Sequence, residues 1–349
     1  METKIIHVTN VENNRSDLQL AADIIKDGGL VIFPTETVYG LGADATNPDA
    51  TAKIYAAKGR PSDNPLIIHI AAPNDAERYA YANSVYYLLA ESFMPGPLTV
   101  ILKSKDTVPG TTRGGLDTVA VRCPENPIAR ELISLSGVAI AAPSANLSGS
   151  PSPTAFDHVF ADMNGRVDAI IDGGSCDFGL ESTIVKIDDN GTLTILRPGK
   201  ITREDIEAIG LTVNIADAVT DSLNENEIAI SPGMKYKHYA PKSPLVLLDG
   251  DNEKIIDYIN KNSHNGSFAV IAYNEDAEYI SSHTACSRVY PFGAKDDEIT
   301  QAHLLFKLLR DTDEGNYSVI YAPLPPKNGI GLALYNRMIR AAAHKIIRL

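Results

Sequence analysis

Several features that would restrict the function of this chain are scarce or missing among its 349 residues. Its three cysteines, Cys123, Cys176 and Cys286, are far apart and odd in number. That spacing excludes a disulfide framework and a thiolate zinc cluster, and it indicates a reducing compartment such as the cytoplasm. No stretch approaches the roughly 18 consecutive apolar residues of a transmembrane helix. The first residues lack a basic region followed by an apolar one, so we expect no secretory signal.

An excess of positive charge is also missing. The formal net charge is −13, and residues 1–210 contain 17 Lys and Arg against 27 Asp and Glu. Because a duplex-binding protein normally presents a basic face, we expect any nucleic-acid binding to be weak or indirect. Local cations are therefore more consistent with a site inside the molecule.

The remaining composition is that of a globular protein with about two domains, since 44% of the residues are hydrophobic and 21% are charged. Periodicity and stop signals predict helices in the first part at residues 15–29, 49–59, 77–94 and 126–137. Apolar runs predict strands there at residues 30–34, 65–71, 98–103, 118–124, 138–146, 167–174, 182–188 and 192–199. This mixture of long helices and short strands predicts an α+β or an open α/β domain.

The pattern changes after a polar, acidic stretch that follows residue 210. Four strands, at 244–250, 267–273, 287–292 and 317–323, alternate with helical segments such as 297–314 and 332–347. Alternation of this kind predicts a smaller Rossmann-like α/β domain. We therefore expect a catalytic domain at 1–212, a linker at 213–241 and a second domain at 242–349.

The sequence contains one glycine pattern of the kind found in nucleotide-binding proteins. "GLGADA" at 40–45 matches G-x-G-x-x-A, but "PTETVY" separates it from the preceding strand. We therefore predict a turn there with no dinucleotide role. No Walker-A pattern occurs in the sequence, so bound ATP would not be held by a P-loop.

The stretch "KGRPSDNP" at 58–65 combines Lys58 and Arg60 with two prolines. Lysine neutralises a phosphate as a compact charge, and arginine adds a planar fork. The prolines reduce the ordering entropy that is lost on binding. The alternative is a solvated loop with two surface cations.

Polar side chains follow several other predicted strands. Thr35 follows the first strand, Ser144 and Asn146 lie in "AAPSANLSGSPSP", and Arg122 and Arg197 lie near the ends of two more strands. Each has a structural alternative: a turn capped by hydroxyls, a surface loop, or a salt-bridged arginine. A lone strand histidine such as the one at position 69 is often a packed core residue.

Taken together, four cations and several hydroxyls at strand ends suit a polyphosphate and a carboxylate in one cleft. The sequence shows no metal-ligand spacing, no acid–base histidine pair and no covalent nucleophile. These features favour phosphoryl or nucleotidyl transfer by positioning and charge neutralisation, with Mg²⁺ accompanying ATP.

The motifs also carry a family resemblance. In order, "FPTETVYGLG", "KGRPSDNPLIIH", "PGPLTVIL", "DTVAVRCPENP" and "AAPSANLSGSPSPT" resemble the YrdC-like domain of threonylcarbamoyl-AMP synthases. "SPGMKYKHYAP" and the α/β tail resemble the long, two-domain form of that family. The resemblance covers essentially the whole chain.

The resemblance implies a reaction. L-threonine, bicarbonate or CO₂, and ATP would give threonylcarbamoyl-AMP and pyrophosphate. A separate transferase complex would use this product to make N6-threonylcarbamoyladenosine (t6A) in tRNA. It also implies the fold of the first domain, a YrdC-like α/β domain with a twisted, mainly parallel sheet and a deep cleft.

The resemblance implies a role for each of a set of residues. Lys58, Arg60, Ser144 and Asn146 would be catalytic. The ATP site would consist of Lys58, Ser62, Thr118, Ser144, Ser152, Arg197 and Tyr236. The threonine site would consist of Thr35, His69, Arg122, Ala142 and Ser182, with Arg122 holding the carboxylate.

The segment "SPGMKYKHYAP" is expected to fold over the cleft as a lid, because a carbamate decomposes readily in water. The alternative is a basic connector between domains. Two other functions were weighed, a non-enzymatic RNA-binding module and a carbamoyl-adenylating enzyme of hydrogenase maturation. The acidic charge speaks against the first, and the scattered cysteines speak against the second. For the tail, a regulatory or docking role is a further alternative.

Overall fold

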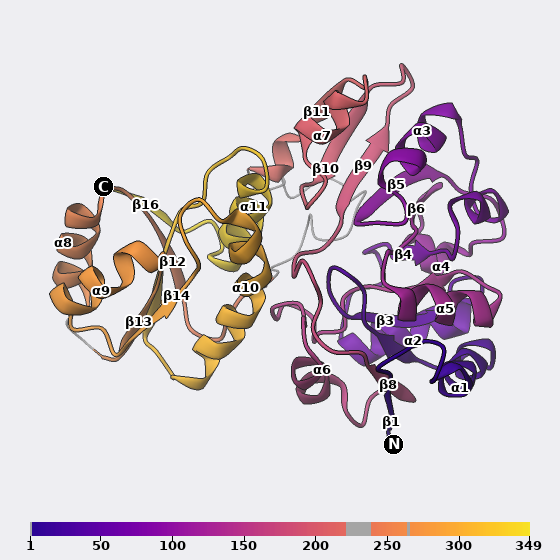
Figure 1. Ribbon diagram of the computed structural model, residues 1–349, viewed down its shortest axis with the longest axis horizontal. Coiled ribbons are helices and arrows are strands. Elements are labelled where there is room, and N and C mark those ends of the chain that lie inside the picture. Colours follow the sequence, from indigo (N-terminus) through magenta and orange to yellow (C-terminus); the bar gives the residue numbers. More distant parts are fainter. Residues whose placement is uncertain (1, 221–238, 264–265) are drawn as a thin grey trace. The chain divides into compact units, whose positions relative to one another are not determined.

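The computed structural model describes residues 2–220, 239–263 and 266–349, which fall into two compact units. The first comprises residues 2–148 with 152–220, and the second residues 149–151 with 239–349. Each unit is built on one sheet (Figure 1). No helix in these ranges is both long enough and apolar enough to span a membrane.

The first unit contains a sheet of eleven strands in the order β1-β8-β2-β3-β7-β4-β6-β5-β9-β10-β11, and five of its ten pairings are parallel. The strands are β1 (Lys4–His7), β2 (Val31–Phe33), β3 (Gly40–Asp44), β4 (Ile67–His69), β5 (Leu98–Lys103), β6 (Thr118–Arg122), β7 (Ile140–Ala141), β8 (Ala169–Asp172), β9 (Thr183–Ile187), β10 (Leu193–Arg197) and β11 (Val213–Ile215).

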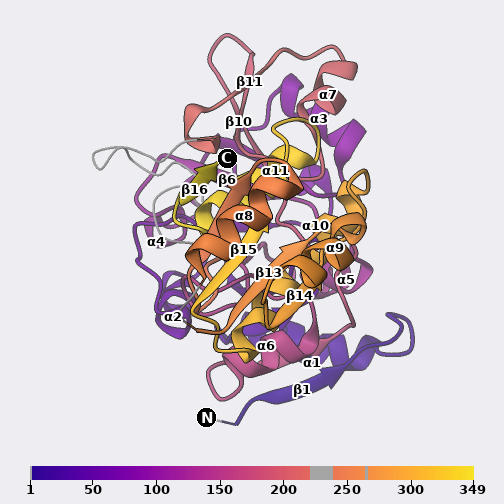
Figure 2. The same cartoon turned by 90° about the vertical axis from the view of Figure 1, so that its left-hand side faces the viewer.

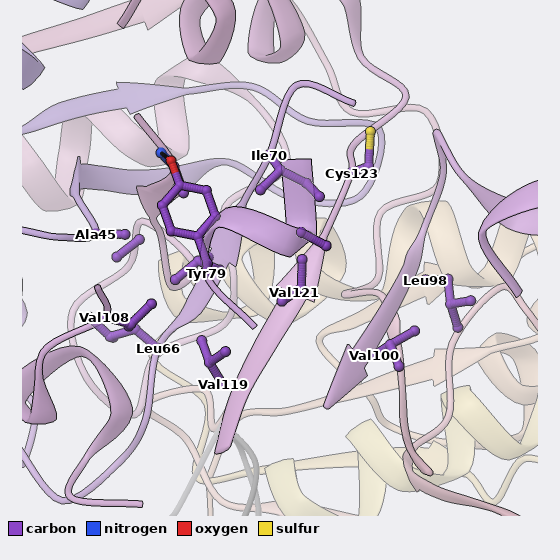
Figure 3. Close-up of a cluster of buried hydrophobic side chains, with 14 of the residues drawn as sticks. Ala45, Leu66, Ile70, Tyr79, Leu98, Val100, Val108, Val119, Val121 and Cys123 are labelled. Atoms are coloured by element: carbon purple, nitrogen blue, oxygen red, sulfur yellow. Dashed lines mark hydrogen bonds between the residues drawn. The ribbon is translucent and has the colours of Figure 1, made fainter. Parts of the chain in front are cut away.

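Helices pack on both faces of this sheet. They are α1 (Arg15–Lys26), α2 (Pro48–Lys58), α3 (Ser84–Phe93), α4 (Gly110–Arg113), α5 (Pro127–Ser136), α6 (Phe156–Met163) and α7 (Arg203–Ala208), with short 3₁₀ turns at Pro73–Arg78 and Asp217–Val219. One apolar cluster joins α1 and α5 to β2. Another joins α2, α3 and α6 to the opposite side of the sheet. Figure 3 shows part of the second cluster, where side chains of β5 and β6 gather with Tyr79.

Local signals explain where the helices begin and end. Asn47 caps α2 by accepting the backbone N–H groups of Asp49 and Ala50, and Gly59 ends the helix at φ 63°. Asn126 caps α5 in the same way, followed by Pro127. Both helices were predicted and are confirmed.

Two predictions about the first unit were wrong. The helix expected over 77–94 begins only at Ser84, because the Asn83 side chain accepts the Tyr86 N–H and caps the helix there. The "GLGADA" stretch is strand β3 and not a turn, and it pairs antiparallel with β2. A Cβ at Gly42 would lie 2.7 Å from Phe33, so glycine allows the two strands to pack against the core. Strand β11 lies at the start of the segment predicted as a linker and extends the sheet beside β10.

The second unit has five strands, all parallel, in the order β14-β13-β15-β12-β16. They are β12 (Leu245–Asp249), β13 (Phe268–Ala272), β14 (Arg288–Pro291), β15 (Val319–Pro323) and β16 (Ile346–Arg348). Its helices are α8 (Asn252–Asn262), α9 (Asn274–His283), α10 (Glu298–Asp311) and α11 (Gly331–Ala341), with a 3₁₀ turn at Thr312–Glu314. Figure 1 and Figure 2 show α8 and α9 on one face of this sheet and α10 and α11 on the other. The Rossmann-like α/β domain is thus confirmed.

The core of the first unit allows a direct test. Tyr79 is buried, and its hydroxyl accepts the backbone N–H of Ala139 at 2.8 Å. Replacing Tyr79 by Phe should lower the free energy of unfolding by about 1–3 kcal/mol, because it leaves that buried N–H without an acceptor. Urea denaturation followed by circular dichroism would measure the change. Tyr81→Phe is the matched control, since Tyr81 is 59% exposed and should show no comparable loss.

Candidate active site

A short loop after β2 forms the first part of the candidate site. Thr35 Oγ1 accepts the backbone N–H groups of Thr37 and Val38, both at 3.2 Å, and contacts the Val38 carbonyl at 2.7 Å. These contacts close the loop on itself at the end of a buried strand. Both threonine side chains are buried, with exposed fractions of 2% or less. The loop therefore holds its side chains in one orientation.

Arg122 lies at the end of β6 and contacts this loop. Its Nη2 donates to Glu36 Oε1 at 2.6 Å and to Thr37 Oγ1 at 2.8 Å. Both charged side chains are only 5% exposed. Glu36 Oε2 in turn accepts the backbone N–H groups of Glu125 and Asn126, at 3.2 and 3.4 Å, where α5 begins. The carboxylate is thus held by one arginine and two amides, as a buried charge requires.

The Arg122 guanidinium retains binding capacity beyond this pair. Its Nε is buried and has no hydrogen-bond partner among the described residues. A buried N–H without an acceptor is costly, so such a group marks a place where a ligand oxygen would be favourable. The salt bridge expected as the structural alternative is confirmed for this arginine, and its role as a carboxylate clamp stays a prediction.

His69 lies beside Arg122, because β4 and β6 pair in parallel with these two residues in register. Burial, and then the positive charge of Arg122, lower the pKa of His69 to about 3. Its Nδ1 lies 3.3 Å from the Ile140 carbonyl oxygen. A carbonyl oxygen can only accept, so the tautomer protonated on Nδ1 would donate to it and leave the Nε2 lone pair to accept. His69 is therefore uncharged at neutral pH.

Lys58 forms the second part of the site with the loop that follows β7. Its Nζ donates to the carbonyl oxygens of Ser144 and Asn146, at 2.5 and 2.6 Å, and lies 3.4 Å from Asn146 Oδ1. Ser144 Oγ donates to the same Oδ1 at 2.5 Å. Lys58 is only 3% exposed. A buried ammonium thus orders the turn that carries the two predicted catalytic side chains.

The third part lies around β9 and β10. Arg197, at the end of β10, donates through Nε to the Ser182 carbonyl at 3.0 Å and through Nη2 to Ser182 Oγ at 3.1 Å. Ser182 Oγ also lies 2.8 Å from Thr99 Oγ1. Ser182 was predicted for threonine and Arg197 for the nucleotide, so their direct contact joins the two predicted halves.

The remaining predicted residues lie in different settings. Ser152 is fully buried and donates to Glu181 at 2.6 Å. Arg60 contacts the carbonyl oxygens of residues 64 and 65, at 3.4 and 3.1 Å. Ser62 is exposed in that loop. Thr118 begins β6, so it lies about 13 Å from Arg122 along the strand.

Ala142 and Tyr236 complete the predicted set. The backbone N–H of Ala142 donates to the Ile67 carbonyl at 2.9 Å, so it is already used within the sheet. Tyr236 and most of the expected lid lie outside the described residues. The lid therefore stays a prediction.

The motif analysis assigned no role to Glu36 or Glu181. Glu36 follows β2 in "TET", and Glu181 precedes β9 in "EST". Each holds a predicted site residue: Glu36 holds Arg122, and Glu181 holds Ser152. An acidic residue next to hydroxyl residues at the end or the start of a strand was the available signal.

The chemistry of these groups excludes some mechanisms. Burial raises the pKa of the Cys123 thiol to about 11, so the cysteine beside Arg122 is not an activated nucleophile. Among residues 2–220, 239–263 and 266–349, no group of three or more His, Cys, Asp or Glu side chains could hold a metal ion. What the geometry offers is fixed cations and hydrogen-bond donors, which suits charge neutralisation.

Comparison with known proteins points in one direction. Residues 23–199 match a family model described as telomere recombination, and residues 201–343 match one described as threonylcarbamoyl-AMP synthase, C-terminal domain. The threonylcarbamoyl-AMP synthase of Bacillus subtilis is 42% identical over 353 residues, with both chains covered fully. That of Pyrococcus abyssi is 41% identical over 336 residues, covering 95% of each chain.

A solved structure extends the likeness to three dimensions. The Pyrococcus abyssi Sua5 protein in complex with L-threonine superposes with a TM-score of 0.89 at 38% sequence identity. All of both chains is covered. The similarity therefore includes both units.

His69 gives this site a pH signature. Its pKa is near 6.5 in the unfolded chain and about 3 in the folded protein. Below pH 6.5 the unfolded state gains a proton that the folded state does not bind. The stabilising contribution is therefore complete above about pH 6.5 and is lost as the pH falls toward 3.

Between pH 7 and pH 5 the free energy of unfolding should fall by about 2 kcal/mol more in the wild type than in His69→Gln, at about 1.4 kcal/mol per pH unit below 6.5. Urea denaturation at the two pH values measures this difference. His283→Gln, at an exposed position, should retain the wild-type dependence. An equal loss in wild type and His69→Gln would contradict the prediction.

Proposed function

Because the chain belongs to the threonylcarbamoyl-AMP synthase family, we propose that its first unit holds L-threonine and ATP so that a carbamate formed on threonine reaches the α-phosphate. The protein is a nucleotidyltransferase that makes threonylcarbamoyl-AMP for t6A modification of tRNA. The observation that carries the assignment is the likeness over the full length of both chains to synthases from two organisms.

The chemistry proceeds in two bond-forming steps. The neutral amine of threonine attacks the carbon of CO₂, which bicarbonate supplies by losing hydroxide, and the amine loses a proton as the carbamate forms. A carbamate oxygen then attacks the α-phosphorus of ATP. The bond to the bridging oxygen breaks, and pyrophosphate leaves with the electron pair. No covalent enzyme intermediate is needed, in agreement with the lack of an activated nucleophile near Arg122.

Arg122 is the proposed clamp for the threonine carboxylate. Glu36 occupies its Nη2, and its buried Nε has no partner among the described residues, so one edge of the fork can receive a carboxylate oxygen. Thr35 Oγ1 lies 3.4 Å from Nη2 of this arginine, and Ser182 is bonded to Arg197. Both hydroxyls are proposed to contact the rest of threonine. Neutral His69 could accept a hydrogen bond from the threonine hydroxyl or amine. Ala142 would take part through its carbonyl, because its N–H is used in the sheet.

The proposed ATP side lies around Lys58. Its contacts with the Ser144 and Asn146 carbonyls support a role in shaping the phosphate-binding turn, with its charge close to the phosphates. Ser144 and Asn146 would present donors to the phosphate oxygens, and Arg60 would neutralise charge in the transition state.

Other residues would complete the nucleotide site. Ser152 is proposed to exchange its bond with Glu181 for a phosphate oxygen when ATP binds. Arg197 would link the nucleotide to the threonine side through Ser182. The rest of the proposed set is Ser62, Thr118 and Tyr236, the last of them outside the described residues.

Mg²⁺ is proposed to arrive with ATP. The described residues offer no cluster of three or more metal ligands, so the phosphate oxygens and water would supply most of its coordination. The ion would neutralise charge on the leaving pyrophosphate. We further propose that the protein acts in the cytoplasm and delivers its product to a tRNA threonylcarbamoyl transferase complex.

The function is tested by following pyrophosphate release with ATP, Mg²⁺, bicarbonate and each amino acid in turn. Release should require threonine and bicarbonate together, and Lys58→Ala should abolish it. Lys53→Ala is the matched control on the same helix, where Nζ contacts only the Gly28 carbonyl among the described contacts. Release with any amino acid and no bicarbonate would point to a different adenylating enzyme.

The clamp is tested by Arg122→Lys, which keeps a cation opposite Glu36 but removes the fork. The KM for threonine should rise about 10- to 100-fold, the equivalent of one charge-assisted hydrogen bond of about 1.5–3 kcal/mol. The KM for ATP should change less than threefold. Arg203→Lys is the control, because Arg203 is an exposed residue paired with Glu207 on α7. A larger change in the KM for ATP than for threonine would place Arg122 on the nucleotide side.

A further inference from the structure

The second unit contains a cavity of about 390 Å³ that the proposed reaction does not use. It lies at the carboxyl ends of β12, β13 and β15, on the face of the sheet that α8 and α9 cover. The chain leaves β12 and β13 toward one face and leaves β14 and β15 toward the other (Figure 1). The cavity therefore lies at a topological switch point, where open parallel sheets bind their ligands. Its volume is within the range of small-molecule sites.

The cavity has an apolar floor and one polar corner. The floor consists of Leu248, Ile255, Val270, Ile280 and Tyr321. In the corner, Asp276 Oδ1 accepts from Asn252 Nδ2 at 2.6 Å and from Lys295 Nζ at 2.8 Å. Both donors use the same oxygen, which leaves Oδ2 available to a ligand hydroxyl. The Asp276 side chain is only 11% exposed and is held in place by its two donors, so it is a fixed, largely buried hydrogen-bond acceptor.

A phosphorylated ligand is disfavoured in this cavity. Its lining includes Asp249, Asp251 and Asp276 against a single cation, Lys295. The helix ends that could receive a phosphate already carry carboxylates: Asp251 caps α8, and Glu275 and Asp276 lie in the first turn of α9. A ligand without negative charge fits this arrangement better.

The corner can recognise neighbouring hydroxyl groups. One hydroxyl can donate to Asp276 Oδ2 while the next accepts from Lys295 Nζ, and a carboxylate near the ends of such strands is a common partner of ribose hydroxyls. Tyr273 also lines the cavity. Burial, followed by nearby carboxylates, raises the pKa of its phenol to about 12, so it remains a hydrogen-bond donor.

We propose that this cavity binds an unphosphorylated nucleoside, with its ribose hydroxyls on Asp276 and Lys295 and its planar base against the apolar floor. The combination of a flat apolar ring and vicinal hydroxyls in one molecule matches the two parts of the lining. The proposal concerns the second unit alone and does not rest on the function proposed for the first.

Adenosine binding to the full chain tests the proposal, measured by isothermal titration calorimetry. The titration is made with threonine and a non-hydrolysable ATP analogue present at saturation, so that the first unit cannot supply the signal. One adenosine should bind per chain. Asp276→Asn should weaken binding at least tenfold, because the ribose loses its carboxylate acceptor.

Two further variants guard the interpretation. Ile255→Trp should abolish binding by filling the cavity from α8. Asp257→Asn on the same helix should bind as the wild type does, because Asp257 is an exposed partner of Lys261. Circular dichroism of each variant shows whether the unit is folded.

Three outcomes would overturn the proposal. These are no adenosine binding to the wild type, binding that survives both Asp276→Asn and Ile255→Trp, and AMP binding as tightly as adenosine. Either of the first two would show that adenosine does not bind in this cavity through Asp276. The third would contradict the argument that the acidic lining disfavours a phosphorylated ligand. The calorimetric experiment measures binding and requires no turnover. It therefore tests the nucleoside proposal even if the pyrophosphate-release assay fails.

Discussion

The buried ion pair between Arg122 and Glu36 is the contact on which the site of the first unit depends. It joins the loop after β2, the end of β6 and the first turn of α5. Two charges at 5% exposure are costly to desolvate, and the Thr37 hydroxyl and two backbone amides offset that cost. The pair also leaves the Arg122 Nε without a partner among the described residues. The same contact thus fixes the loop and leaves free, among the described residues, the N–H group that we propose for the threonine carboxylate.

The rest of the site follows the same principle of fixing charge before substrate arrives. Lys58 is held by two carbonyl oxygens, and Arg197 is held by Ser182. Groups ordered in this way lose little entropy on binding and need little reorganisation during the reaction. This suits nucleotidyl transfer to an unstable carbamate, which requires two substrates to meet at a defined distance. In the second unit, Asn252 and Lys295 likewise hold the carboxylate of Asp276 in one position.

Local sequence signals were sufficient to predict several helices and the positions of several buried polar residues. Caps and periodicity located α2 and α5, and strand-end polar residues located Arg122, Ser144 and Arg197. Two features depended on distant partners and were not predictable. Strand β3 is rich in glycine and forms because it pairs with β2, and Glu36 gains its role from an arginine 86 residues away. Sequence spacing carries no information about such contacts until the strands are paired.

The most direct test of the account compares L-threonine with L-threoninol, which lacks the carboxylate, by isothermal titration calorimetry. If the Arg122 fork receives the carboxylate, the wild type should bind threonine at least tenfold more tightly, the equivalent of 1.4 kcal/mol or more. That difference should shrink in Arg122→Lys. Equal binding of the two compounds by the wild type would contradict the account, because the buried fork would then have another purpose.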